Sequence, residues 1–149
     1  MKFKGEQNFQ HENEQKKGVL IAYLGTPDSP DVLSVRRYLK EFLSDPRIIE
    51  VPKIIWWFIL NIFILNFRSF NSARLYKSIW TDGGSPLLVN CLKIKEKVQK
   101  SLPSNYQVAL GMRYGNPSIK SALNELKEAN CRDIEVITLF PHYLSLIHI

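Results

Sequence analysis

The feature that most constrains the fold is an apolar run, GVLIAYLG, which spans residues 18–25 and ends in glycine. Almost every position is apolar, so the run lacks the alternation of apolar and polar residues that is typical of a strand with one solvent-exposed face. Such a run is typical of a strand covered on both faces, as in parallel sheets. Two further strand-like runs follow later in the chain, YQVALGM at 106–112 and DIEVITLF at 133–140.

Helical patterns lie between these runs. The first helix is predicted to have Ser29 as its N-cap and Pro30 at its first position. The last is predicted over 116–130, with Asn116 as its cap and Pro117 at its first position. Further helices are expected over 71–80 and 87–101. Alternating strands and helices imply right-handed crossovers, so the predicted fold class is α/β with a doubly wound parallel sheet.

The run IIWWFILNIFIL, at 54–65, is apolar nearly all round, with Asn61 as its one interruption. A bilayer span needs about 20 such residues, so the run alone is too short to cross a membrane. It is predicted to be a buried core helix. The alternative is a helix whose apolar side faces a greasy ligand or a membrane interface.

Parallel sheets of this kind bind ligands beyond the carboxyl ends of their strands. The segments to examine are therefore GTPDSP, RYGNP and PHY, each directly after a strand run. A net charge of +6 favours acidic partners, although many domains are simply basic. The lysines and arginines are scattered and form no nucleic-acid motif, so no nucleic-acid partner is expected.

Several chemistries are disfavoured by these loops. Gly25 is followed by Thr26-Pro27 rather than a dinucleotide fingerprint, and a proline offers a phosphate no N–H. Cys91 and Cys131 match no metal or iron–sulfur spacing, and no metal site is predicted. The GGSP loop could hold a carboxylate, but a glycine turn that caps the next helix is at least as good an interpretation.

Taken together, the loops resemble those of bacterial ferrochelatases, which insert ferrous iron into protoporphyrin. The resemblance rests on GVLIAYLGTPDSPDVLSVRRYLKEFLSDPRIIEVPKIIWW, YKSIWTDGGSPLLV, ALGMRYGNPSI and ITLFPHY, in that order. It implies the first of two Rossmann-like chelatase halves, truncated, with porphyrin held in the cleft between the halves. It also implies that residues 54–65 form an apolar lip that contacts porphyrin and could make peripheral contact with a membrane.

The resemblance further implies which residues bind porphyrin. These are Leu24, Arg68, Tyr76, Ser85, Arg113 and Tyr143. Leu24 would touch the ring, while Arg68, Tyr76 and Ser85 match positions near the propionates. Arg113 and Tyr143 lie in motifs that line the same cleft. A flat apolar ring with two carboxylates needs such a greasy wall with a few charged anchors.

No catalytic residue is predicted within this chain. The family places the histidine and the acidic residue of the metallation step in its second half, beyond Ile149. His142 is interpreted as a pocket or structural residue, since no orienting partner for a base is visible. Fe²⁺ and protoporphyrin are the expected substrates, with no tightly bound cofactor. Two alternatives are a porphyrin-binding module without catalysis and a chelatase for another tetrapyrrole.

The two ends of the chain carry their own expectations. Residues 1–17 are predicted to be a disordered polar tail without a signal peptide, which favours a cytoplasmic protein, membrane-associated if the lip meets a bilayer. The domain is expected over 18–143. Residues 144–149, LSLIHI, match an in-frame reading of the transposon end used to prepare sequencing libraries, and are interpreted as adapter read-through. Without a following helix, the third strand should expose apolar surface and an open edge.

Overall fold

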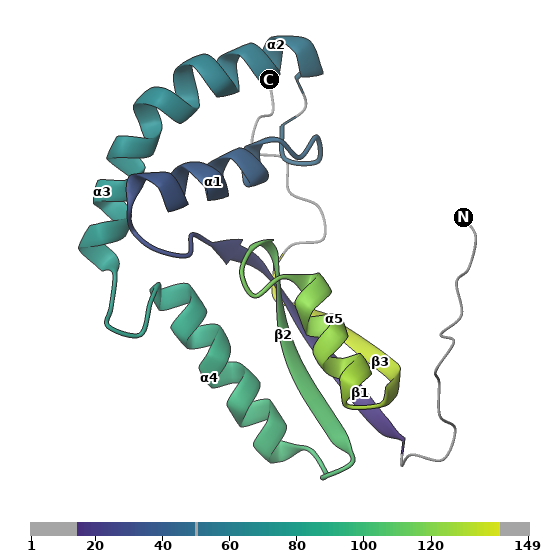
Figure 1. Cartoon of the computed structure of the whole chain (residues 1–149). Coiled ribbons are helices and arrows are strands. Elements are labelled where there is room, and N and C mark those ends of the chain that lie inside the picture. Colours follow the sequence, from purple (N-terminus) through teal and green to yellow (C-terminus); the bar gives the residue numbers. More distant parts are fainter. Residues whose placement is uncertain (1–14, 50, 141–149) are drawn as a thin grey trace.

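The computed structural model of the chain describes residues 15–49 and 51–140. Within these residues, three parallel strands form a sheet in the order β2-β1-β3. The strands are β1 (Lys16–Thr26), β2 (Tyr106–Gly115) and β3 (Cys131–Thr138). Figure 1 shows α4 (Pro86–Ser101) beside one face of the sheet and α5 (Ile119–Glu128) beside the other. The predicted α/β class with helices on both faces of a parallel sheet is confirmed.

The central strand explains why the first run is apolar throughout. On one face, Val19 and Ile21 pack with Cys91 of α4. On the other face, Leu20 packs with Leu126 of α5. Both sets of side chains are removed from water, so no position in the middle of β1 has reason to be polar.

The third strand has less cover. Val136 and Ile137 of β3 are 58% and 45% exposed. Among the described residues β3 pairs with β1 alone, so its outer edge carries unpaired backbone groups. This agrees with the exposure expected from the sequence, and an apolar strand with a free edge is a site for unwanted association.

The bounds of all three strands differ from those predicted, and β2 continues to Gly115, three residues past its predicted end. β1 begins at Lys16, so Lys16 and Lys17, which the sequence assigns to the polar tail, belong to the sheet. Lys17 pairs with Tyr106 and Asp133, and its amide donates to the Asn105 carbonyl at 2.9 Å. Backbone pairing extends a strand past its apolar core, because the ladder does not depend on side-chain polarity. Similarly, β3 begins at Cys131 and ends at Thr138, two residues before the predicted positions at each end.

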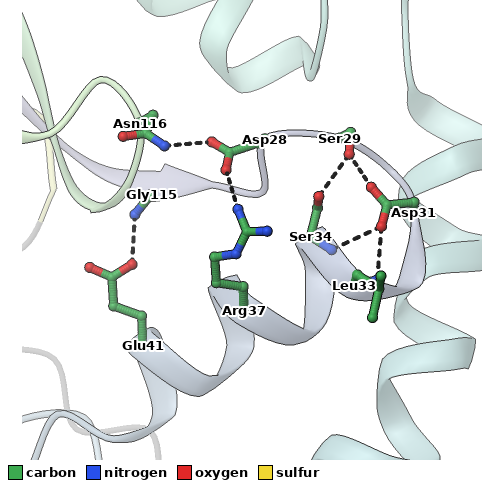
Figure 2. Close-up of polar contacts among 9 residues, drawn as sticks. All are labelled: Asp28, Ser29, Asp31, Leu33, Ser34, Arg37, Glu41, Gly115 and Asn116. Carbon is green, nitrogen blue, oxygen red and sulfur yellow. Dashed lines mark hydrogen bonds and ion pairs between the residues drawn. The ribbon is translucent and has the colours of Figure 1, made fainter.

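The N-cap predicted for the first helix is wrong. Helix α1 spans Val32–Leu43, and its N-cap is Asp31, whose carboxylate accepts from the amides of Leu33 and Ser34 at 2.8 and 3.0 Å. Ser29 instead donates to the Asp31 carboxylate (Figure 2). Pro30 therefore precedes the helix rather than opening it. A carboxylate that reaches two helical amides is the better cap, because it also offsets the positive end of the helix.

The cap predicted for the last helix is also wrong. Helix α5 begins at Ile119, and the hydroxyl of Ser118 accepts from the amide of Ser121 at 3.1 Å. Asn116 uses its side chain elsewhere, donating to Asp28 at 2.9 Å. The Asn116–Pro117 peptide is cis. A distant partner thus removes Asn116 from the capping position that its local sequence suggests.

The prediction that residues 54–65 form a buried core helix is wrong. The segment forms α2 (Lys53–Phe58) and most of η1 (Ile59–Arg68), which is wound as a π-helix and continues into α3 (Ser69–Ile79). Ile54, Trp57 and Phe63 are 77%, 58% and 59% exposed. Figure 1 shows these helices beside α1 at one end of the sheet, where no other described element covers their outer side.

The helix is also longer than the apolar run alone. Lys53–Ile79 is one helix of 27 residues, because the apolar run joins the helix predicted over 71–80. By length and composition it is the one helix among the described residues that could cross a membrane. Residues 54–65 taken alone are too short to cross a bilayer, but the continuous helix that contains them is long enough.

Candidate functional site

The carboxyl ends of β1 and β2 lie in close contact, with Gly25 paired with Tyr114 and Thr26 with Gly115. A Cβ on Gly25 would lie 1.8 Å from the Tyr114 carbonyl oxygen, and one on Gly115 would lie 2.5 Å from the Thr26 carbonyl oxygen. Both glycines have positive φ angles, of 123° and 80°. No other residue fits either position, because the backbones leave no room for a side chain and L-residues rarely adopt these angles. The carboxyl ends of the two strands are therefore fixed against each other.

An apolar cluster packs against the carboxyl ends of β1 and β2. Tyr38, Ile48, Ile49 and Tyr114 are its buried members, and Leu24 packs against them. Leu24 is half-buried at the end of β1. The sequence-predicted ring contact thus lies where the strands end, with part of its side chain accessible.

Tyr76 of α3 joins this cluster through aromatic contacts. Its ring meets the edge of the Tyr38 ring at a centroid distance of 6.4 Å, and the Tyr38 ring stacks on Phe42 at 5.9 Å. The Tyr38 hydroxyl donates to the Gly25 carbonyl at 3.3 Å. Burial raises the pKa of Tyr38 well above its usual value, and that of Tyr76 in the same direction. Both phenols are therefore neutral near pH 7 and serve as an apolar wall with hydrogen-bond donors.

Arg113 has a protein partner. Its Nη2 donates to Asp45 Oδ2 at 2.8 Å, and the Tyr114 hydroxyl donates to the same oxygen, also at 2.8 Å. The Asp45 side chain is 10% exposed, whereas that of Arg113 is 44% exposed. Asp45 also accepts from the Arg47 amide at 2.9 Å. The contact ties the end of β2 to the turn after α1, and leaves one side of the guanidinium facing solvent.

These contacts make Asp45 a source of acid sensitivity. Burial alone would raise the pKa of the Asp45 carboxyl, but hydrogen bonds from Arg47, Arg113 and Tyr114 outweigh it and lower the pKa from 3.8 to about 2. A pKa below the unfolded value means that this contribution to stability is full above pH 3.8 and is lost as pH falls toward 2. We expect Asp45→Asn to flatten this part of the profile of urea midpoint against pH. Asp82→Asn, in the exposed turn before α4, should leave the profile unchanged, and an unchanged Asp45→Asn profile would contradict the assignment.

A further polar network lies beside the carboxyl ends of β1 and β2. It was not predicted from the sequence. Figure 2 shows Asp28 accepting from Asn116 and Arg37, at 2.9 and 3.3 Å, and Glu41 accepting from the Gly115 amide at 3.0 Å. These residues line a cavity of about 210 Å³. The signal that could have indicated the network is the position of Asp28 and Asn116, each directly after a strand.

The GGSP loop takes the structural role that the sequence left open. Ser85 is the N-cap of α4, accepting from the Leu88 amide at 3.1 Å, and is 2% exposed. Thr81 and Gly84 exchange backbone hydrogen bonds of 3.0 Å in the turn before it. The hydroxyl is thus used to begin a helix, and its contact with a propionate stays a prediction.

The chain matches the family model described as Ferrochelatase over residues 16–146. Among curated relatives, a ferrochelatase of Alcanivorax borkumensis is 50% identical over 147 residues, covering 96% of this chain. One of Coxiella burnetii is 53% identical over 131 residues, covering 88% of it, and one of Thioalkalivibrio sulfidiphilus is 48% identical over 147 residues, covering 96%. The chain belongs to the ferrochelatase family.

The match covers nearly all of this chain but only part of each relative. The aligned region is 43%, 37% and 40% of the Alcanivorax, Coxiella and Thioalkalivibrio ferrochelatases, respectively. The chain therefore spans about two fifths of the length of these ferrochelatases. The resemblance stated from the sequence is confirmed, as is its restriction to the N-terminal portion of the family.

The structure brings some of the predicted porphyrin-binding residues together and separates others. Leu24 and Tyr76 adjoin one cluster through Tyr38, and Arg113 is tied to the same cluster through Tyr114. Ser85 lies in the cap of α4, and Arg68 is exposed at the end of η1. Tyr143 and His142 lie outside the described residues.

Metal binding has no ready-made site in the described part of the chain. No group of three His, Cys, Asp or Glu side chains lies close enough to hold an ion there. All three histidines of the sequence, His11, His142 and His148, fall outside those residues.

Proposed function

We propose that this chain provides the porphyrin-facing N-terminal part of a ferrochelatase, which inserts Fe²⁺ into protoporphyrin to form haem. The reaction is that of a lyase, since it makes metal–nitrogen bonds. One observation carries the proposal: a half-buried Leu24 and the rings of Tyr38 and Tyr76 gather at the carboxyl ends of the strands. This is the position at which open parallel sheets bind ligands, and an apolar wall suits a flat macrocycle.

Charged side chains near this wall would bind the propionates. Arg68 is exposed on the lip helix, and the guanidinium of Arg113 is partly exposed beside the cluster. A guanidinium can donate two parallel hydrogen bonds to one carboxylate, which orients the ligand as well as binding it. In this proposal Asp45 holds Arg113 in place, and one side of the guanidinium remains for the porphyrin.

The chain supplies binding rather than the metallation chemistry. Metallation needs a group that takes up the pyrrole protons, and a base of this kind needs an orienting partner. The tyrosines of the wall are neutral hydrogen-bond donors near pH 7, so they cannot take up the pyrrole protons. We therefore propose that no catalytic residue lies in this chain, that Fe²⁺ is a substrate, and that no tightly bound cofactor takes part.

The lip gives the proposed location. Its exposed side carries Ile54, Ile55, Trp57, Phe58 and Phe63, and we propose that it meets porphyrin and the surface of a membrane. Large apolar patches of this kind mark interaction sites on soluble proteins. The protein would then be cytoplasmic, with peripheral membrane contact.

An assay of haem formation tests whether this chain lacks the residues that insert the metal. Fe²⁺ and protoporphyrin are incubated anaerobically with the purified chain, and with the Alcanivorax borkumensis ferrochelatase as the positive control. We expect the haem spectrum from the control and none from this chain. Haem formed by the chain alone would show that the metallating residues lie within it.

Porphyrin binding tests the site itself, by the shift of the Soret band during titration. Arg68→Gln should weaken binding of protoporphyrin by roughly ten- to a hundredfold, the value of one charged hydrogen bond. Arg74→Gln makes the same charge change on an exposed residue of α3, and should have little effect. No shift would contradict porphyrin binding by this chain, and equal effects of the two substitutions would contradict the role of Arg68.

A further inference from the structure

The lip contains a repeat with a period of five residues. The tetrapeptide FILN occurs at 58–61 and again at 63–66. Apart from Phe58, the last residue of α2, both copies lie in η1, the segment that is wound as a π-helix. A π-helix closes its hydrogen bonds between residues five apart, which is the period of the repeat.

Burial follows the same period. Leu60 and Leu65 are 3% and 2% exposed, whereas Phe58 and Phe63 are 51% and 59% exposed. In an α-helix, residues five apart point about 140° away from each other, so one leucine of the pair would leave the core. Winding with the wider turn keeps both leucines on one face. Beyond the repeat, buried residues return to α-helical spacing, with Leu65, Ser69 and Ala73 four residues apart.

Side-chain amides satisfy the carbonyls of this wide turn. Asn66 Nδ2 donates to the carbonyls of Ile62 and Asn61, at 2.8 and 3.1 Å. Asn61 Nδ2 donates to the Trp57 carbonyl at 2.8 Å. From α1, Arg36 Nη2 donates to Asn66 Oδ1 at 3.0 Å and so orients the amide. We name Arg36 and Asn66 the latch.

An α-helical lip would make different contacts. If η1 relaxed to α winding while α3 stayed packed, every residue before it would rotate about the helix axis. Leu60 would leave the core, and Trp56 would lose the bond of 2.6 Å from its Nε1 to the Leu43 carbonyl. Extended π winding is rare beside α winding, so it persists where other contacts hold it.

We propose that η1 is a two-state element, in which the latch holds the π winding that docks the lip, and release of the latch lets it rewind as an α-helix and rotate away. The consequence for porphyrin entry rests on the proposed function, because Tyr76 lies on the same continuous helix. The winding itself does not.

Hydrogen exchange of the Trp56 indole N–H, followed by NMR in detergent micelles, tests the switch without porphyrin. Asn66→Ala and Arg36→Met should each speed this exchange by about tenfold, as expected for the loss of one charged hydrogen bond. Asn71→Ala changes an exposed asparagine of α3 and should leave it unchanged.

Deletion of Ile62 gives a variant in which loss of the latch should no longer matter. It shortens the repeat to four residues, which lie about 40° apart in an α-helix, so α winding then keeps both leucines on the core face. In this background Trp56 should stay docked, and Asn66→Ala should no longer speed its exchange. Unchanged exchange in the full-length chain with Asn66→Ala, or a speed-up that persists in the deletion, would overturn the proposal. Because no ligand is present, these results are independent of whether the chain binds porphyrin.

Discussion

Gly25→Ala is expected to abolish the folded state of this chain. The new methyl group would lie 1.8 Å from the Tyr114 carbonyl oxygen, and the backbone would have to keep a φ of 123°. Relief requires β1 and β2 to separate at their paired carboxyl ends, so the cost should exceed about 4 kcal/mol, which few single substitutions reach. The loss would appear as the absence of a cooperative thermal transition and of the far-ultraviolet circular dichroism of the sheet.

Gly84→Ala is the matched control. Gly84 also has a positive φ, of 111°, but a Cβ there would meet only Leu88 Cδ2, at an ordinary 3.8 Å. It therefore carries the backbone strain without the collision, and should cost about 1–2 kcal/mol. Equal losses for the two variants would mean that backbone strain, rather than the close approach of the two strand ends, limits Gly25.

Leu126→Ala should be the next most damaging change, at about 3 kcal/mol. Leu126 is fully buried between α5 and the sheet, where it packs with Leu20 and Ala109. Removing its side chain loses the transfer free energy of the buried atoms and leaves a cavity that a rigid sheet cannot fill. Urea unfolding followed by circular dichroism measures the difference.

Leu123 on the same helix gives the comparison, because its side chain is 39% exposed. Leu123→Ala makes the same chemical change with the same effect on helix propensity, and should cost less than about 1 kcal/mol. A small loss for both variants would show that α5 is loosely packed on the sheet.

The strands could be predicted from sequence because burial on both faces leaves a direct trace in composition. The helix starts could not be predicted as well, since Ser29, Asp31, Asn116 and Ser118 are all good caps by residue type. Tertiary contacts decide among them: Asn116 bonds to Asp28, which lies far away in the sequence. No local pattern contains that information.

The candidate site was predicted in part for the same reason. The topology of a parallel sheet pointed to the segment that contains Arg113, whereas Leu24 was implied by the resemblance alone; both residues lie near the ends of their strands. The bond between Arg113 and Asp45 joins residues that no motif connects. The pattern of residues 54–65 favoured a core helix, because apolar composition does not distinguish a core helix from an exposed one. The resemblance to ferrochelatases, in contrast, implied an apolar lip. The five-residue period of FILN was the signal that could have shown its winding.

The position of β1 in the middle of the sheet has a consequence for the order of folding. Val19 pairs with Val108 on one side and with Glu135 on the other. Of the three described strands, β1 is synthesised first, and it must therefore wait, with its apolar side chains uncovered, until β2 and β3 have been synthesised. Helices form from local contacts and can appear early, but this sheet closes late, because long-range pairing must first overcome the entropy of loop closure. During that interval β1 is the segment that most needs protection by a chaperone.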